Sequence, residues 1–169
     1  MRQRISLHIP LQRPISMTSS AIRYWILIHT EIWAYGYWAI DRCARIIKEG
    51  ASFKEVTKGD LTEVEGYIAQ AYAIKALCSF YLTNMFGLPY SEANKTTLGI
   101  VNVTEPVPAY SQVSRVSVEQ NYSLILDDIT KAKEYYAKEG VENVGKQYMN
   151  TAAVAALEAR VKLYMKNYE

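Results

Sequence analysis

The sequence predicts an all-α fold in which two antiparallel helical hairpins stack on each other, joined by a long intervening loop. Apolar residues recur at three- and four-residue steps in four separate segments. Glycine, proline or a capping residue marks an end of each segment. Half of the 169 residues are hydrophobic, so the chain is long and apolar enough to bury the core of one domain.

The first hairpin is predicted from residues 20–49 and 60–86. Gly50 follows the first helix and is expected to cap its C-terminus. The carboxylate of Asp60 is expected to cap the second helix, with Glu63 reaching back as in a capping box. The second helix has apolar residues on two sides, which predicts that it lies between neighbouring helices.

The position of this turn fixes which residues of the two helices face each other. Trp33 is then expected opposite Ala76, and Ile40 near Ile68 and Ala69. Large residues that face small ones let antiparallel helices interdigitate at close distance.

The same register separates the two cysteines of the chain. Cys43 lies about 6 residues from the turn and Cys78 about 18, so their levels along the hairpin differ by roughly 18 Å. A disulfide cannot span that distance. We therefore expect two buried free thiols.

The second hairpin is predicted to begin at Ser117, where Gln120 follows at the spacing of a capping box. Its first helix closes before Gly140, and its second begins near Asn150. Facing residues are expected to pair as Tyr136 with Ala152, Ala132 with Ala156, and Ile125 with Leu163.

Residues 88–116 form a long connection that contains Pro89, Pro106 and Pro108. Loops of more than about 12–15 residues are uncommon in compact domains unless they are functional. We therefore expect the functional residues to lie in this loop. Residues 1–19 match no helical pattern and are expected to form an unstructured tail before a helical domain over residues 20–169.

Composition and motifs argue against an enzyme and against a nucleic-acid-binding protein. The 19 basic and 17 acidic residues are mixed along most of the chain, so no basic face emerges. Metal-ligand spacings, a phosphate-binding glycine loop and a nucleophile elbow are missing, and we expect no metal or cofactor. His29 is expected to be a core histidine. Asp127 and Asp128 diverge by about 100° on a helix, which favours a solvated face over an acid/base pair.

Residues 24–40 are the nearest approach to a membrane span, and a membrane-inserted protein is a further alternative. The segment is short for a span and carries Glu31 in its middle, where a charge is costly. Residues 1–19 show no secretory signal, because polar residues and prolines interrupt their apolar positions. They also match no lipid-anchor motif.

Three blocks of sequence occur in order, at residues 70–90, at 106–108 with 117–132, and at 150–168. The first block is a helix that ends in Phe86-Gly87-Leu88-Pro89-Tyr90. In this order and spacing the blocks resemble the SusD/RagB family of outer-membrane nutrient-uptake lipoproteins. The resemblance covers roughly residues 30–169. Gln70 and Lys75 stand where that family usually has glutamate and arginine.

The resemblance implies tetratricopeptide-like helices that support a glycan-binding subunit at the cell outer membrane. It also implies a TonB-dependent (SusC-like) transporter and an oligosaccharide or polysaccharide as partners. The chain would supply the helical scaffold for noncatalytic glycan capture. Family members are much longer and begin with a lipoprotein signal, so we expect this chain to be a fragment.

Sugar rings bind by stacking on flat aromatic surfaces with polar groups nearby. Most of the 14 tyrosines and three tryptophans fall on helical stripes and are explained as core. Packing against neighbouring helices or against a missing partner is favoured over sugar contact for the remaining four. These are the carbohydrate-binding candidates: Tyr90 and Tyr110 in the loop, and Trp25 and Trp38 partly off the stripe of the first helix.

A plain tetratricopeptide-like protein-protein interaction module is the alternative to glycan capture. A groove lined by asparagine, lysine and arginine would indicate peptide binding. An exposed aromatic shelf would indicate glycan binding.

Overall fold

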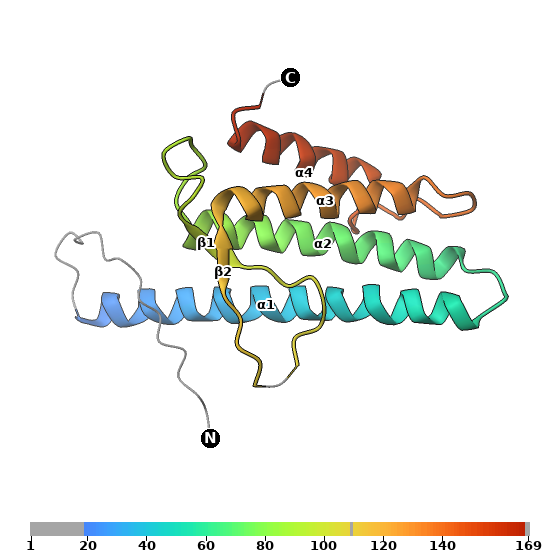
Figure 1. The fold of residues 1–169 in the computed structure, drawn as a ribbon, viewed down its shortest axis with the longest axis horizontal. Coiled ribbons are helices and arrows are strands. Elements are labelled where there is room, and N and C mark those ends of the chain that lie inside the picture. Colours follow the sequence, from blue (N-terminus) through green and yellow to red (C-terminus); the bar gives the residue numbers. More distant parts are fainter. Residues whose placement is uncertain (1–18, 109, 168–169) are drawn as a thin grey trace. The chain divides into compact units, whose positions relative to one another are not determined.

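The computed structural model describes residues 19–108 and 110–167 and is mainly helical (Figure 1). In chain order the elements are α1 (Ser19–Val56), α2 (Thr62–Phe86), β1 (Leu98–Val101), β2 (Arg115–Ser117), α3 (Val118–Tyr136) and α4 (Thr151–Tyr164). The all-α class is therefore confirmed, with one small sheet added. The chain divides within α1, between Ile32 and Trp33, into two compact units, which we describe separately. The predicted tail lies outside the described residues except for Ser19, with which α1 begins.

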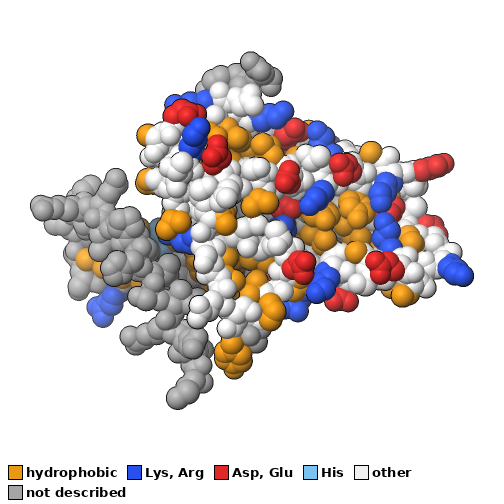
Figure 2. All heavy atoms as spheres, in the orientation of Figure 1, with side chains coloured by type: hydrophobic (Ala, Val, Ile, Leu, Met, Phe, Trp, Pro, Cys, Tyr) orange, Lys and Arg blue, Asp and Glu red, His pale blue; other side chains and the backbone are white. Residues whose placement is uncertain are grey.

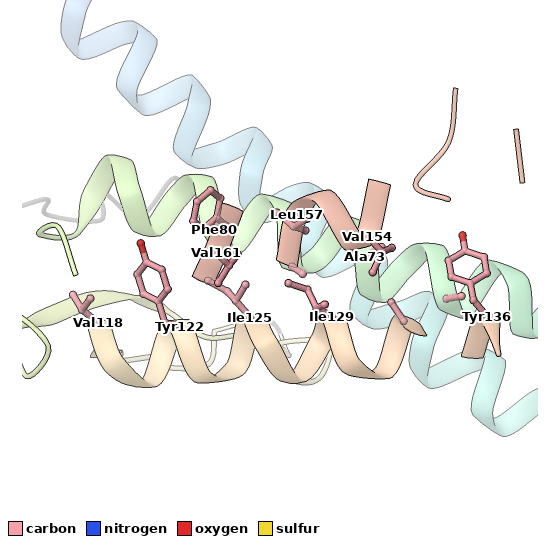
Figure 3. Packing of buried hydrophobic residues seen from close by; sticks show 13 residues of the cluster. Ala73, Phe80, Val118, Tyr122, Ile125, Ile129, Tyr136, Val154, Leu157 and Val161 are labelled. Atoms are coloured by element: carbon pink, nitrogen blue, oxygen red, sulfur yellow. The ribbon is translucent and has the colours of Figure 1, made fainter. Parts of the chain in front are cut away.

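The hydrophobic core of the second unit lies where α2, α3 and α4 run side by side (Figure 1). Figure 3 shows apolar side chains of α3 pointing toward α2 and α4. These side chains are almost fully buried, and burying each one contributes about 1.5–3 kcal/mol. The central residues are Val118, Tyr122, Ile125 and Ile129 of α3, Ala73 and Phe80 of α2, and Val154, Leu157 and Val161 of α4.

The predicted starts of α3 and α4 are confirmed in detail. The Ser117 hydroxyl accepts from the Gln120 backbone N–H at 3.2 Å, and the Gln120 side chain accepts from the Ser117 N–H at 3.1 Å. The Asn150 side chain accepts from the Ala153 N–H at 2.9 Å. Each contact satisfies a backbone donor that a helix start leaves unpaired.

The start of α2 differs from the prediction. Asp60 accepts from the Thr62 backbone N–H at 2.9 Å, but the residue at the N-cap is Leu61. Glu63 does not reach back toward the cap; it accepts instead from the Tyr67 hydroxyl at 2.6 Å. The predicted capping box is therefore wrong, although Asp60 still pairs a donor of the first turn.

Helix α1 does not end at Gly50 but continues to Val56, so the predicted cap is wrong. Gly50 lies against α2, where an added Cβ would come within 2.8 Å of Ile68 Cδ1. A glycine inside the helix thus allows close approach to α2 instead of ending the helix. Gly50, and not Ile40, lies beside Ile68, so the predicted placement of Ile40 near Ile68 and Ala69 is also wrong.

The later turn shifts the whole register of the first hairpin. The Trp33 ring packs edge to face on Phe86, with ring centroids 4.8 Å apart, and not on Ala76. The predicted pairing of Trp33 with Ala76 is wrong by ten positions, or ~15 Å along the helix. Within the second unit, residues 33–56 of α1 pack antiparallel on α2, and α2 lies between this part of α1 and α3 as predicted.

The corrected register brings the two cysteines to neighbouring levels. Cys43 is buried and Cys78 is half-buried, and both are free thiols. Cys78 is close enough for its charge to act on the Cys43 thiol. The predicted separation of roughly 18 Å is therefore wrong, for the same reason as the aromatic pairing.

Helix α4 packs on α3 through the face opposite to the predicted one. Val154, Leu157 and Val161 are buried, whereas Ala152, Ala156 and Leu163 are exposed. The predicted pairs of Tyr136 with Ala152, Ala132 with Ala156, and Ile125 with Leu163 are therefore wrong. Branched side chains bury more apolar area than alanine, which favours the valine and leucine face.

A buried ion pair joins α2 to α3. Lys75 Nζ lies 2.9 Å from the carboxylate of Asp128, and the two side chains are only 6% and 7% exposed. Burial raises the pKa of the Asp128 carboxyl, while Lys75 acts in the opposite direction. Asp127 is exposed as predicted, but the prediction that Asp128 is solvated is wrong. Lys75 therefore finds its charged partner on another helix.

The predicted loop at 88–116 is interrupted by a two-stranded antiparallel sheet that extends to Ser117, with Leu98 opposite Ser117 and Val101 opposite Arg115. The Arg115 guanidinium donates to the carbonyl of Gly99 and, at 2.8 Å, to the carbonyl of Phe86 at the end of α2. The connection then consists of this sheet and two irregular stretches, residues 87–97 and 102–114.

A second anchor ties β1 to α3. The buried Asn121 side chain accepts from the Ile100 backbone N–H at 2.7 Å. Gly99 is needed beside it, because a Cβ at this position would overlap the Asn121 oxygen. The last residue of β1 also contacts α1, where the Tyr37 hydroxyl donates to the carbonyl of Val101 at 2.9 Å.

Candidate functional site

The two candidate tyrosines of the connection lie in different surroundings. Tyr90 is half-buried and packs edge to face on Tyr122, with ring centroids 5.0 Å apart. Tyr90 thus belongs to the packing around the core. Tyr110 is 97% exposed and has a positive φ of 66°. Its ring is accessible to a ligand.

The candidate Trp25 lies in the first unit. Its ring centroid is 3.8 Å from that of His29. His29 Nδ1 lies 2.8 Å from the Trp25 carbonyl oxygen one helical turn earlier. His29 is half-buried and these two contacts lie within one turn of helix, so the prediction of a core histidine is not confirmed.

The candidate Trp38 belongs to an exposed aromatic pair on α1. Trp38 and Tyr35 are each 59% exposed, and their rings meet edge to face with centroids 5.4 Å apart. We call this pair the α1 shelf. Trp33 and Tyr37 occupy the inward side of the same helix, where they contact Phe86 and the Val101 carbonyl. The aromatic residues of α1 that pack against the core and those that are exposed thus lie on different sides of the helix.

Charged groups lie one turn beyond the α1 shelf. Arg42 follows Trp38 by four residues and is exposed, so it continues the same helix face. Arg45 donates two hydrogen bonds to Asp41, at 2.8 and 3.3 Å. Aromatic rings beside hydrogen-bonding groups offer both the apolar face and the polar contacts that a sugar ring requires.

The shelf residue Tyr35 was missed by sequence reasoning. A signal for it was present, because Tyr35 precedes Trp38 by three residues and lies off the stripe of Trp33 and Tyr37. Two aromatic residues spaced three apart on a polar face predict an exposed pair.

A second aromatic pair lies where α2 meets α3. Tyr72 and Tyr135 stack with centroids 5.9 Å apart. Lys131 lies 5.5 Å from the centre of the Tyr72 ring, and Lys138 lies 4.2 Å from that of Tyr135. These ammonium groups already engage the ring faces, so the pair is less available to a sugar than the α1 shelf.

On the face seen in Figure 2, apolar patches lie among interspersed basic and acidic side chains.

An open groove lies between α1 and α2 near their connecting turn. Apolar side chains line most of it, with Glu49 beside them; they include Ile46, Phe53, Val56, Val64 and Ile68. This lining differs from the asparagine, lysine and arginine lining expected of a peptide-binding module.

Two features of the structure bear on metal binding and on membrane insertion. Within residues 19–108 and 110–167, no group of three or more His, Cys, Asp or Glu side chains is placed to hold a metal ion. Across that same part of the chain, no helix combines the length and apolar character needed to cross a membrane, residues 24–40 included.

A family model described as "Starch-binding associating with outer membrane" matches residues 20–163. The chain therefore belongs to the SusD-like family, and the resemblance found in the sequence is confirmed. The family is described by binding and not by catalysis, in agreement with the prediction of a nonenzymatic protein.

Solved structures share the fold. A SusD superfamily protein from Bacteroides thetaiotaomicron has a TM-score of 0.70 and 28% identity, over 80% of this chain and 28% of that one. A SusD superfamily protein from Bacteroides vulgatus has a TM-score of 0.68 and 26% identity, over 80% and 30%. The surface glycan-binding protein A of Bacteroides fluxus, at 24% identity and a TM-score of 0.58 over 80% and 26%, shares the fold. The chain thus spans less than a third of each of these proteins. No curated protein matches it.

Proposed function

We propose that this chain takes part in noncatalytic glycan capture, as part of the helical scaffold of a SusD-like outer-membrane uptake complex. The observation that carries the proposal is the exposed α1 shelf of Tyr35 and Trp38 with Arg42 one turn away. The proposed ligand is an oligosaccharide or polysaccharide. The proposed partner is a TonB-dependent (SusC-like) transporter, and the proposed location is the cell outer membrane.

The chemistry of the α1 shelf suits a sugar. The C–H face of a pyranose ring can lie on the exposed Trp38 indole, and the edge-on Tyr35 ring gives the indole a fixed neighbour. The Arg42 guanidinium carries five N–H donors for sugar hydroxyls or a ring oxygen. Because neither ring stacking nor hydrogen bonding requires a charge on the sugar, this arrangement suits both neutral and anionic sugars.

The alternative of a tetratricopeptide-like interaction module has less support. Its expected groove lining of asparagine, lysine and arginine does not occur in the groove between α1 and α2. An exposed aromatic shelf, which indicates glycan binding, occurs on α1.

Affinity gel electrophoresis of the chain with soluble polysaccharides, starch among them, tests the proposal. We expect retardation of the wild-type chain by at least one polysaccharide. Trp38→Ala should weaken that binding by about tenfold or more, as for an aromatic anchor. Tyr148→Ala is the matched control, because Tyr148 is also exposed but lies in the segment before α4.

Tyr110→Ala distinguishes a glycan site in the connection between β1 and β2 from one on α1. If Tyr110→Ala abolishes retardation and Trp38→Ala does not, the glycan site lies in residues 102–114 and the α1 shelf is not the site. If no polysaccharide retards the wild-type chain, glycan capture by this chain is refuted. Copurification with a TonB-dependent transporter from the same outer membrane tests the proposed partner separately.

A further inference from the structure

The two cysteines lie on facing helices, at nearly the same level of the α1 and α2 hairpin. Gly50 of α1 lies beside Ile68 of α2. Cys43 precedes Gly50 by seven residues, so in an antiparallel pair its level corresponds to Lys75, seven residues after Ile68. Cys78 is three residues further, or ~4.5 Å along the axis.

Contacts on both sides of the cysteines fix this register. Gly36 of α1 faces Leu82 of α2, where an added Cβ would meet Leu82 Cδ2 at 2.9 Å. Near the turn, Lys54 Nζ lies 2.5 Å from Glu65 Oε1. The cysteines lie between these two contacts along the hairpin. The glycines at positions 36 and 50 allow the helix backbones to approach closely.

The surroundings of the thiols agree with this placement. Burial raises the pKa of the Cys43 thiol to about 11, and the charge of Cys78 raises it further. Burial also raises the pKa of the Cys78 thiol. Cys43 is 4% exposed, whereas Cys78 is half-buried. The Cys78 thiol is thus more accessible to a small oxidant than the Cys43 thiol.

We propose that Cys43 and Cys78 form an intrachain disulfide on oxidation, which links α1 covalently to α2. With oxidised glutathione, the Cys78 thiolate attacks the glutathione disulfide and releases one glutathione thiolate. The Cys43 thiolate then attacks the Cys78 sulfur of the mixed disulfide and releases the second glutathione. Two protein thiols lose two electrons and two protons, and one glutathione disulfide becomes two thiols. The proposal is independent of glycan binding.

Such a link would close a loop that contains the whole turn between α1 and α2. Closing a loop of this size restricts the unfolded chain and stabilises the folded one. It would also fix the part of α1 that carries the α1 shelf against the body of the second unit. Disulfides persist in oxidising environments such as the periplasm and cell surface.

The test uses the folded 169-residue chain, reduced and then incubated with oxidised glutathione. Intact mass spectrometry should show a loss equal to two hydrogen atoms, and peptide mapping should show a Cys43–Cys78 link. The oxidised chain should melt on the order of 10 °C above the reduced chain. Cys43→Ser and Cys78→Ser should abolish the mass loss, with Cys43→Ser trapping the mixed disulfide on Cys78.

Several outcomes would overturn the proposal. The native chain could keep both thiols, accept only glutathione adducts, or form disulfide-linked dimers instead of the intrachain link. A link that forms only in urea would show that the folded hairpin holds the sulfurs apart. Circular dichroism of each serine variant establishes that it is folded, and Cys78→Ala serves as a second variant in case Cys78→Ser unfolds.

Discussion

Loss of one member of the Lys75–Asp128 ion pair should destabilise the protein much more than replacement of both. The two side chains are 6% and 7% exposed, and the ammonium lies 2.9 Å from the carboxylate. Asp128→Ala leaves a buried ammonium without its partner. Such a change typically costs about 3–5 kcal/mol, a large share of the 5–15 kcal/mol by which a domain of this kind is usually stable.

The double replacement Lys75→Met with Asp128→Leu should behave differently. It removes both charges and fills the space with apolar side chains, so its stability is expected within ~2 kcal/mol of the wild type, or above it. Urea unfolding followed by far-ultraviolet circular dichroism measures the free energy of unfolding for each variant. Asp127→Ala is the matched control, because its carboxylate is exposed and should change stability by less than ~0.5 kcal/mol.

Two results would refute this reasoning. Single variants that cost less than ~1 kcal/mol would show that the pair is solvated in solution. If the double variant loses as much free energy of unfolding as the sum of the losses in the two single variants, the two charges act independently. The comparison requires that the dependence of unfolding on urea has the same slope in all variants, since a changed slope signals a changed unfolded or native state.

Three further predictions concern the anchors around the core. Gly99→Ala should lower the free energy of unfolding by about 1–3 kcal/mol, because the added methyl group would displace the Asn121 oxygen from the Ile100 N–H. Calorimetry should show a lower melting temperature. In an Asn121→Ala background the same substitution should lower the melting temperature less. Lys138 and Lys54 lower the pKa of the Glu65 carboxyl. The resulting stability is present above the unfolded-state pKa of about 4.3 and is lost as pH falls through the lower folded-state value. Urea unfolding at a series of acidic pH values should therefore show a steeper loss for the wild type than for Glu65→Gln. Tyr37→Phe removes the hydrogen bond to the Val101 carbonyl and should cost about 1 kcal/mol by chemical unfolding; an unchanged stability would show that this contact is absent in solution.

Features that depend on neighbouring residues in the sequence could be predicted. The Ser117 and Asn150 caps require only a side chain and a backbone N–H three residues later, so the starts of α3 and α4 follow from local sequence. The end of α1 could not be predicted in the same way. Gly50 is a typical helix stop in isolation, and only the position of Ile68 on a distant helix explains a glycine inside the helix. One misplaced turn then shifted every pairing in that hairpin.

Long-range burial explains the other differences. Asp127 and Asp128 are adjacent and chemically identical, yet only Asp128 faces Lys75 on α2. Helix α4 has an alanine face and a valine and leucine face, and the choice between them depends on what α2 and α3 present. Periodicity identifies the faces of a helix but not their partners. The sheet within residues 88–116 has a similar origin, because Arg115 and Asn121 hold strands that are too short to be predicted from pattern.

The arrangement of α1 determines how well binding and stability can be separated by experiment. Trp33 and Tyr37 are involved in packing, so their loss would disturb the fold together with any site. Tyr35 and Trp38 have their mutual contact on the exposed side and should be removable at little cost to stability. Loss of glycan binding in a Trp38→Ala variant that unfolds at the wild-type urea concentration would therefore report on the α1 shelf itself. A Trp38→Ala variant that loses several kcal/mol of stability would instead place this indole in the packing of the second unit, and the proposed site would have to be sought around Tyr110.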